Sequence, residues 1–259
     1  MCRYPIVLVH GIAMKQIGIL NAFGQIGEEL KKDGHRVYVA EIDGFGSIET
    51  NAEQLKRYIS SVLEKEKVDK VNIIAHSKGG LDTKYMITNL GMEHAVASLT
   101  TLCTPHKGSI IASKIWELPS FMKKSISFFI DSFYRIVFHD EHPDSMKTCE
   151  QLRQIGDDSN EMLNFSYLVY CQSYSAVIDK AKDCFIMALP MKIHHHYENY
   201  TSDGLVSEDS TQFGNYRGHC LDIPISHVQI IDLFAKKSQK ERIYTFYKRV
   251  CKELEEMNF

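Results

Sequence analysis

Short apolar segments alternate with segments of helical periodicity through the N-terminal half of this chain of 259 residues. Ile6–Val9 and Val71–Ala75 are brief runs rich in β-branched residues, which is typical of strands buried on both faces of a parallel sheet. Between them, apolar residues recur on one helical face; they are Ile48, Ala52, Leu55, Ile59 and Val62. This alternation predicts an α/β fold with a mostly parallel central sheet and helices on both faces.

The remaining elements follow from the same two periodicities. Further strands are expected at Arg36–Ala40, Val96–Cys103 and Tyr167–Gln172. Helices are expected over Ile19–Leu30, with Gly34 at its C-terminal end, over Leu81–Leu90, and from Ile243 to Leu254. We expect all of these elements to belong to one domain that spans residues 1–259.

Composition excludes several classes of protein. Hydrophobic residues make up 44% of the chain and charged residues 24%, which suffices for one large core and excludes a disordered chain. The net charge of −3 gives no basic footprint, so we expect no nucleic-acid partner. No apolar run reaches the ~18 residues that a transmembrane helix needs. Seven scattered cysteines and the lack of a signal peptide at Met1–Pro5 predict a cytoplasmic protein; the alternative is a secreted protein whose signal peptide has been removed.

The stretch from Ile110 to Phe138 has a helical pattern but is unusually aromatic. Its aromatic residues are Trp116, Phe121, Phe128, Phe129, Phe133, Tyr134 and Phe138. A helix that is apolar beyond one face must hide that surface in a core, a cleft, a partner or lipid. We therefore expect residues 110–145 to form an inserted helical lid, and an ordinary pair of core helices is the alternative.

The segment Val71–Leu81 places Ser77 between a buried strand and a helix. Small residues, Ala75 and Gly79, stand two positions before and after it, so the segment has the G-x-S-x-G pattern of a nucleophile elbow with Ala75 as its first small residue. Such a turn holds the serine in a strained backbone conformation, and the small neighbours are needed where strand and helix crowd together. The pattern predicts Ser77 as a nucleophile, and a serine in an ordinary strand–helix turn is the alternative.

A nucleophilic serine needs preorganised hydrogen-bond donors for the oxyanion that forms during attack. One expected donor is the backbone N–H that follows the nucleophile, here that of Lys78. The second usually comes from a loop after an early strand, and His10-Gly11-Ile12 directly follows the first strand. The N–H of Ile12 is therefore the second candidate, while a tight strand exit is the alternative explanation of His10-Gly11.

The acid and the histidine are expected to follow the serine in that order along the chain. His219 and His227 both lie late enough, and we predict His227 because a polar tip is followed there at once by an apolar segment. Asp203 lies in Ser202–Val206, which has the turn chemistry of a loop at a strand end, and is the predicted acid. The competing carboxylates are interpreted as surface charges; they are Glu208, Asp209 and Asp222.

Five motifs occur in order along the chain: Tyr4–Gly11, Val71–Leu81, Thr104–Ser109, Ser202–Val206 and the segment around His227. Together they resemble the bacterial triacylglycerol lipases of the α/β-hydrolase superfamily, from residue 4 to about residue 235. The resemblance implies the α/β-hydrolase fold, with Ser77 as nucleophile, Asp203 as acid and His227 as base. It also implies the N–H groups of Ile12 and Lys78 as oxyanion donors.

The same resemblance implies that the aromatic insertion is a lid over an acyl-binding cleft. The residues then expected to contact the substrate are His10, Gly11, His76, Phe129 and Phe133. The implied activity is that of a serine hydrolase that cleaves lipid acyl esters through an acyl-enzyme. The alternatives are a soluble esterase, a lysophospholipase or an amidase on the same scaffold, or a non-catalytic binding protein. The expected partners are a small-molecule or lipid ester and, transiently through the lid, a lipid interface.

Three positions depart from the family's pattern. Ala75 replaces the usual glycine, and Lys78 brings a cation beside the nucleophile where related sequences often carry Gln or Met. Gln229 stands where many of these lipases have a calcium-binding aspartate two residues after the catalytic histidine. Asp179 could match their other calcium aspartate, but a single carboxylate would bind the ion weakly. We expect no obligatory metal and no cofactor.

Two histidine-rich segments, residues 139–142 and 194–196, lack the ligand spacing of a tetrahedral metal site. Consecutive histidines in a strand or loop point in different directions and seldom converge on one ion. We therefore interpret both segments as polar surface.

Overall fold

The structure is a computed structural model, and it describes residues 1–13, 22–155, 168–180, 183–197 and 201–259. Six strands form one sheet in the order β2-β1-β3-β4-β5-β6, and each neighbouring pair is parallel. The strands are β1 (Ile6–Val9), β2 (Val37–Val39), β3 (Val71–His76), β4 (Val96–Leu102), β5 (Tyr170–Ser175) and β6 (Asn215–His219). The predicted parallel sheet is confirmed.

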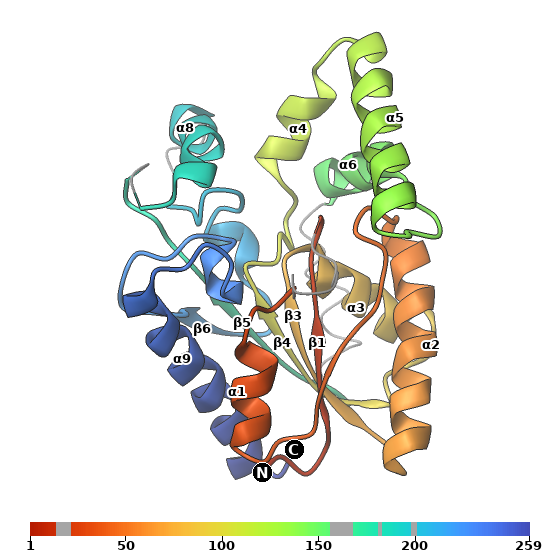
Figure 1. Ribbon diagram of the computed structural model, residues 1–259, viewed down its shortest axis with the longest axis vertical. Coiled ribbons are helices and arrows are strands. Elements are labelled where there is room, and N and C mark those ends of the chain that lie inside the picture. The colour runs from red at the N-terminus through yellow and green to blue at the C-terminus, as the bar shows by residue number, and fades with distance from the viewer. Residues whose placement is uncertain (14–21, 156–167, 181–182, 198–200) are drawn as a thin grey trace.

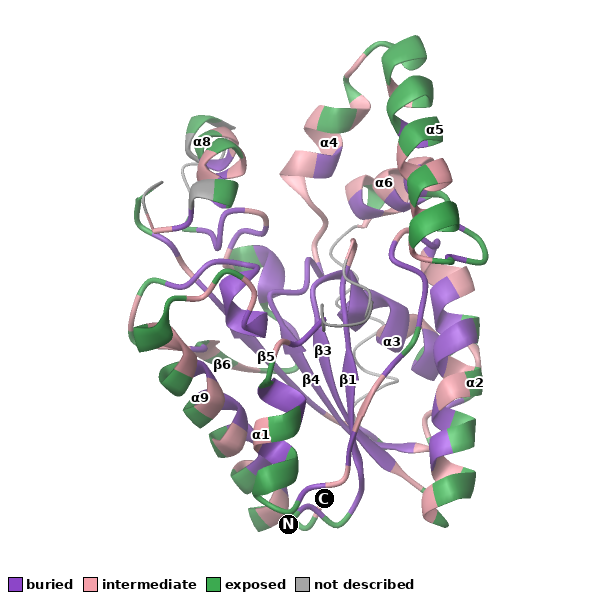
Figure 2. Cartoon of the chain, viewed as in Figure 1, coloured by how far each residue is buried: buried purple, intermediate pink, exposed green. Residues whose placement is uncertain are grey.

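Helices cover both faces of this sheet, as predicted (Figure 1). α1 (Ile26–Lys32) and α9 (Lys237–Glu256) lie on one face, and α2 (Ile48–Glu66) and α3 (Lys78–Asn89) lie on the other. Successive side chains of a strand point to opposite faces. Thus Ile6 and Leu8 of β1 join the core around α1 and α9, while Val7 and Val9 join the core around α2 and α3. Figure 2 shows β1, β3 and β4, at the centre of the sheet, buried between these two layers.

Some helix boundaries agree with the predicted ones and others differ. α2 begins at Ile48, as its periodicity suggested, and Ser47 caps it by accepting a hydrogen bond at its Oγ from the N–H of Thr50 at 3.2 Å. α3 begins at Lys78, three residues earlier than the periodicity suggested. The described part of the helix expected over Ile19–Leu30 begins only at Ile26, and Ile19 lies outside the described residues. Tyr167, expected to begin a strand, also lies outside them.

Beyond the carboxyl edge of the sheet stand three further helices, which we call the cap (Figure 1). They are α4 (Ile110–Trp116), α5 (Ser120–Val137) and α6 (Ser145–Gln154), and α8 (Ala188–Tyr197) stands across from them. The helical character predicted from Ile110 to Phe138 is confirmed. The carboxyl ends of parallel strands, where the cap lies, are the usual edge for a binding site in α/β folds.

The side of α5 that contacts α6 carries polar residues. Its buried Ser127 has its hydroxyl 2.8 Å from that of Ser145, and the N–H of Ser145 donates to Asp131. Phe129 and Phe133, by contrast, are 72% and 52% exposed, and most of the helix is exposed in Figure 2. The alternative in which α5 is an ordinary core helix is therefore wrong.

Candidate active site

Ser77 stands at a sharp turn between β3 and α3. Its backbone has a φ of 55° and a ψ of −135°, a conformation that side-chain-bearing residues rarely adopt. Two hydrogen bonds hold the turn: the N–H of Ser77 donates to the carbonyl of Leu102 at 2.9 Å, and the Thr104 hydroxyl donates to the carbonyl of Ser77 at 2.8 Å. The strain expected of a nucleophile elbow is present at this residue.

The loop after β1 lies directly against this elbow, and two glycines make the approach possible. A Cβ atom on Gly11 would lie 2.5 Å from the Cβ of Ser77. A Cβ on Gly79 would lie 2.4 Å from the carbonyl oxygen of His10. Any side chain at either position would therefore push the loop and the serine apart.

The structure brings Ser77, His227 and Asp203 into one hydrogen-bonded chain, although they lie far apart in the sequence. The Nε2 atom of His227 is 2.9 Å from the Ser77 hydroxyl oxygen, and its Nδ1 atom is 2.6 Å from Asp203 Oδ2. The other carboxylate oxygen of Asp203 accepts the N–H groups of Leu205 and Val206, each at 2.8 Å. All three side chains are buried or nearly so, so the hydrogen bonds are sheltered from competing water.

The surroundings of the three hydrogen-bonded residues decide which groups near them carry a charge. Burial by itself would raise the pKa of Asp203, but the attraction of His227 and the hydrogen bonds to the carboxylate lower that pKa below its usual value. Behind His227 lies His76, whose Nε2 is 2.8 Å from the carbonyl oxygen of His227 and whose ring centre is 4.5 Å from that of His227. Burial, and then the charge of His227, lower the pKa of His76 well below its usual value. His76 is thus neutral at neutral pH and supports the loop that carries His227.

The competing residues lie elsewhere. His219 is 47% exposed in its side chain and pairs with Glu208 at 3.0 Å. The carboxylates of Asp209 and Asp222 are exposed and pair with Lys107 and Arg242. None of these residues is among those that line the cavity next to Ser77.

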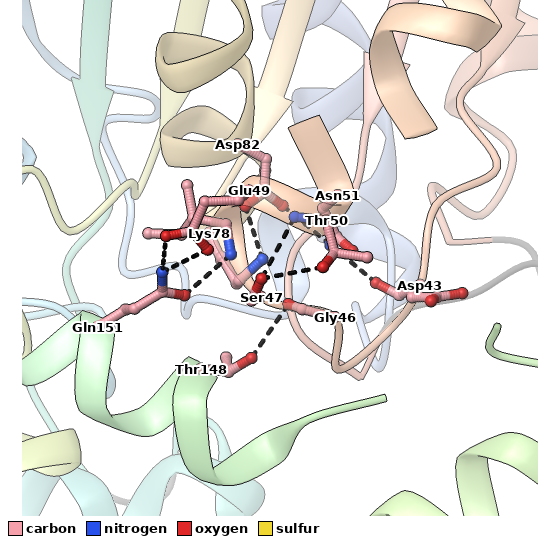
Figure 3. A network of polar contacts seen from close by, with 12 residues as sticks. Asp43, Gly46, Ser47, Glu49, Thr50, Asn51, Lys78, Asp82, Thr148 and Gln151 are labelled. Carbon is pink, nitrogen blue, oxygen red and sulfur yellow. Dashed lines mark hydrogen bonds and ion pairs between the residues drawn. The ribbon is translucent and has the colours of Figure 1, made fainter. Parts of the chain in front are cut away.

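The ammonium of Lys78 does not reach the nucleophile, so the expected cation beside Ser77 is absent from that place. The side chain is 1% exposed and ends 2.6 Å from Asp82 Oδ1. Asn51 of α2 donates to the other oxygen of Asp82, and Figure 3 shows how this pair joins a polar network beneath the elbow. Burial lowers the pKa of Lys78 and raises that of Asp82 to about 6. The backbone N–H of Lys78, by contrast, is at the first turn of α3, where N–H groups have no partner within the helix.

The polar network continues into the cap. Gln151 of α6 donates to the carboxylate of Glu49 and accepts the N–H of Ile48, at the start of α2. Thr148 of α6 donates to the carbonyl of Gly46 at 3.0 Å. Figure 3 shows Gln151 and Thr148 meeting the residues around Lys78. The elbow and the base of the cap are therefore parts of one connected polar structure.

Ser77 and His227 open into a cavity of about 450 Å³, which we call the central cavity. Apart from them its walls are mainly apolar and come from both the sheet edge and the cap; they include Ile12, Trp116, Ile126, Ile130, Leu152, Val206 and Val228. His76 also lines it, as expected. His10, Gly11, Phe129 and Phe133 were expected to contact substrate but are not among its lining residues. The two phenylalanine rings are 72% and 52% exposed, and Ile126 and Ile130 are the apolar side chains that α5 contributes to the cavity wall.

Residues 5–164 match the protein family described as palmitoyl protein thioesterase. The chain belongs to the palmitoyl protein thioesterase family. Triacylglycerol lipase 2 of Saccharomyces cerevisiae is 29% identical over 217 residues, which cover 78% of this chain and 60% of that protein. The triacylglycerol lipase of Burkholderia plantarii is 38% identical over 121 residues, which cover 45% of this chain and 33% of that protein. The predicted resemblance to triacylglycerol lipases is confirmed, and the chain spans from a third to 60% of the length of these relatives.

Solved structures show the fold of this family member. Staphylococcus hyicus lipase superposes with a TM-score of 0.68 at 16% identity, over 97% of this chain and 95% of that one. The mature form of Bacillus licheniformis lipase BlEst2 superposes with a TM-score of 0.63 at 17% identity, over 88% of this chain and 86% of that one. These likenesses confirm the α/β-hydrolase fold.

The two positions that correspond to calcium-binding aspartates of related lipases, Gln229 and Asp179, have other surroundings in this family member. Gln229 is buried; its side-chain Oε1 accepts the N–H of Ser226, and its side-chain Nε2 donates to the carbonyl of Asp183. Asp179 is exposed. The segment 194–196 lies in helix α8 and not in a strand or loop; His194 is buried, so its interpretation as surface is wrong, whereas His196 is exposed as expected.

Sequence reasoning missed one neighbour of Asp203. Cys103 follows β4 with a φ of 54°, is fully buried, and has its sulfur within 4.8 Å of ligand atoms of Asp203 and His227. Burial is the main cause that raises the pKa of its thiol well above the usual value, so the thiol stays protonated. Nothing in the sequence marks a cysteine for this position, since the tertiary fold alone brings it to the carboxylate.

Proposed function

We propose that this chain is a serine carboxylester hydrolase that cleaves lipid acyl esters. The observation that carries this proposal is the hydrogen-bonded chain of Ser77, His227 and Asp203 at the polar end of an apolar cavity of about 450 Å³. A hydrocarbon chain would bury its surface against the cavity walls, which stabilises binding by about 25 cal/mol per Å². The relatives named triacylglycerol lipase support the same class of substrate.

In the proposed mechanism, His227 Nε2 takes the proton of Ser77, and the Ser77 oxygen attacks the ester carbonyl. The N–H groups of Lys78 and Ile12 stabilise the oxyanion that forms. His227 then gives its proton to the departing alcohol, which leaves an acyl-enzyme. Water, deprotonated by His227, releases the acid and restores Ser77. Asp203 holds the tautomer of His227 and stabilises its charged form.

In this proposal residues 1–259 form one domain, and residues 110–145 act as its lid. Eight apolar side chains of α5 are exposed, and they are Phe121, Met122, Ile126, Phe128, Phe129, Phe133, Ile136 and Val137. A patch of this kind on a helix at the rim of an apolar cavity suits transient contact with a lipid interface. Within the described residues, no helix has the length and apolarity to span a bilayer. A cytoplasmic location stays a prediction from the sequence.

A thioester substrate is the second candidate, because the family that matches residues 5–164 is described by that activity. Attack by Ser77 on a thioester would pass through the same acyl-enzyme with a thiol as leaving group. Palmitoyl esters of a matched alcohol and thiol would separate the two candidates by their kcat/KM values. A dependence on acyl length in p-nitrophenyl esters would separate a lipase from an esterase of short soluble substrates.

The decisive experiment is Ser77→Ala, assayed on a lipid ester and labelled with a fluorophosphonate probe. We expect kcat to fall by about 10⁴ to 10⁶-fold and labelling to disappear, because the nucleophilic oxygen is lost. The melting temperature serves as the control for folding. Turnover near the wild-type value in a folded Ser77→Ala preparation would rule the mechanism out.

A further inference from the structure

A second cavity of about 200 Å³, which we call the side pocket, adjoins the central cavity at Ser109, which lines both. It lies where α4 begins, where α6 ends, and beside α8. Its walls differ from those of the central cavity because polar and ionic side chains replace hydrocarbon; they include Lys107, Arg153, His194, Ser207 and Asp209. Two cavities of opposite chemistry therefore meet at one residue.

Arg153 supplies a positive charge to the side pocket. Its guanidinium carbon lies 5.1 Å from the centre of the Trp116 ring, and no carboxylate of the described residues pairs with it. Its Nε atom is buried and has no hydrogen-bond partner within that part of the chain. A guanidinium offers five donors in a planar fork that fits phosphate and carboxylate oxygens.

Lys123 adds a second cation, on the wall of the central cavity. Its Nζ lies 4.2 Å from the centre of the same Trp116 ring and donates to the Trp116 carbonyl at 2.7 Å. It too has no carboxylate partner among the residues described, and it lines the central cavity. The chain as a whole carries a net charge of −3, so this concentration of positive charge is local.

The carboxylate that lines the side pocket does not cancel this charge. Asp209 is 58% exposed and is paired with Lys107 at 3.1 Å. The pair is neutral in sum, so among the described residues that line the pocket the charge of Arg153 is not balanced by a carboxylate. Charge-assisted hydrogen bonds from a guanidinium to an anion are about twice as strong as neutral ones.

We propose that the side pocket binds the phosphate group of an anionic substrate, a monoacyl lipid phosphate whose hydrocarbon chain lies in the central cavity. This inference rests on the proposed ester hydrolysis and names the class of ester that the site prefers. Arg153 holds the phosphate, and Lys123 adds to the attraction from the neighbouring wall.

The test compares monolauroylglycerol with monolauroylglycerol phosphate, each below its aggregation concentration so that no lipid surface contributes. We expect the wild type to favour the phosphate ester in kcat/KM by about 10- to 100-fold, as loss of a charge-assisted contact typically implies. Arg153→Gln should abolish most of this preference while kcat/KM for monolauroylglycerol stays within about twofold. Arg135→Gln removes an exposed cation from the same cap and should leave the preference unchanged.

Asp209→Asn gives the opposite sign, because it removes the pocket's carboxylate and frees Lys107. We expect this variant to raise the preference for the phosphate ester. Because residue 209 is exposed, the substitution should not unfold the protein. Inorganic phosphate should inhibit the wild type with an inhibition constant larger than the dissociation constant of the lipid phosphate. It should not inhibit Arg153→Gln. Inhibition by phosphate without any preference between the two esters would mean that the pocket takes the free anion, which overturns the proposal.

Equal kcat/KM for the two esters in the wild type, or a preference that neither Arg153→Gln nor Asp209→Asn changes, would also overturn it. Failure of the proposed function is distinguishable, since the wild type would then hydrolyse neither ester. Melting temperatures of the variants identify any loss that comes from unfolding.

Discussion

Helices α2 and α5 are similar in length and amphipathic, yet the apolar side of α2 faces the sheet and the aromatic side of α5 faces solvent. α2 buries its apolar side, including Leu55 and Ile59, against the sheet. α5 turns its aromatic side to solvent and docks through polar residues such as Ser127 and Asp131. Periodicity in the sequence therefore locates a helix and its apolar face, whereas the elements that pack against the helix decide whether that face is buried.

The physical cause lies in what each helix packs against. α2 meets a sheet face made of apolar side chains, where burying one leucine or isoleucine stabilises the fold by about 1.5–3 kcal/mol. α5 meets α6 and the loop after β1, where Tyr134 donates to the carbonyl of Ala13 at 3.1 Å. We call the sheet and the helices that pack on its two faces the body. The free energy of unfolding should therefore respond strongly to substitutions in the body and weakly to substitutions on the outer side of the cap.

The largest effect on stability is expected at the buried pair under the elbow. Lys78→Met leaves Asp82 buried without its cation and should lower the free energy of unfolding by about 3–5 kcal/mol. The double variant Lys78→Met/Asp82→Asn removes both charges, while the new amide can still accept from Asn51. We expect it to regain most of the loss. Urea unfolding measures all three proteins, and a double variant no better than the single one would contradict this account.

A second effect in the body depends on pH. His106 is buried, its ring stacks on Phe213 at 4.4 Å, and burial lowers its pKa to about 3. Its unfolded pKa is about 6.5, so the folded state binds fewer protons between these values. The stability that His106 contributes is present above pH 6.5 and is lost as the pH falls toward 3.

His106→Gln removes this titration and keeps a group that can bond to Thr101. Between pH 7 and pH 5 the variant should lose about 2 kcal/mol less unfolding free energy than the wild type. His142→Gln, at an exposed histidine, is the matched control and should follow the wild-type curve. Parallel pH curves for His106→Gln and the wild type would refute the assignment.

The sequence predicted most of the body because its pattern there is redundant. The strand before Ser77, the small residues around it and the helix after it all indicate one turn, and the structure has a strained serine at that place. The direction of Lys78 could not be predicted, because Asp82 lies one helical turn further on and either solvent or the interior could have received the pair. The orientation of α5 also could not be predicted, because its docking partners Ser145 and Ala13 are distant in the chain.

A smaller effect is expected where Gln229 replaces the calcium aspartate of related lipases. Its amide links Ser226 to Asp183, which gives the His227 loop a hydrogen-bonded support that needs no ion. Gln229→Ala should cost about 1–3 kcal/mol in unfolding free energy. Prolonged EDTA treatment should leave the melting temperature and the ester hydrolysis unchanged. A drop on EDTA treatment that added Ca²⁺ reverses would show that the loop depends on calcium.

The smallest effect on stability is expected on the outer side of the cap. Phe129→Ser/Phe133→Ser should change the unfolding free energy by about 0.5 kcal/mol or less per site, because both rings are largely exposed. Phe246→Ser in α9 is the matched control: its ring is 2% exposed, and loss of a buried phenylalanine costs about 3–5 kcal/mol.

Activity should show what the exposed rings do. We expect wild-type hydrolysis of an ester to rise above its solubility limit, because opening the lid onto lipid keeps aromatic surface out of water. The double variant should lose that rise and keep its rate on a short soluble ester. A simultaneous fall in both rates and in melting temperature would mean that the two rings stabilise the fold and do not serve a lid. A wild type without the rise would make the cap a fixed wall and the enzyme an esterase.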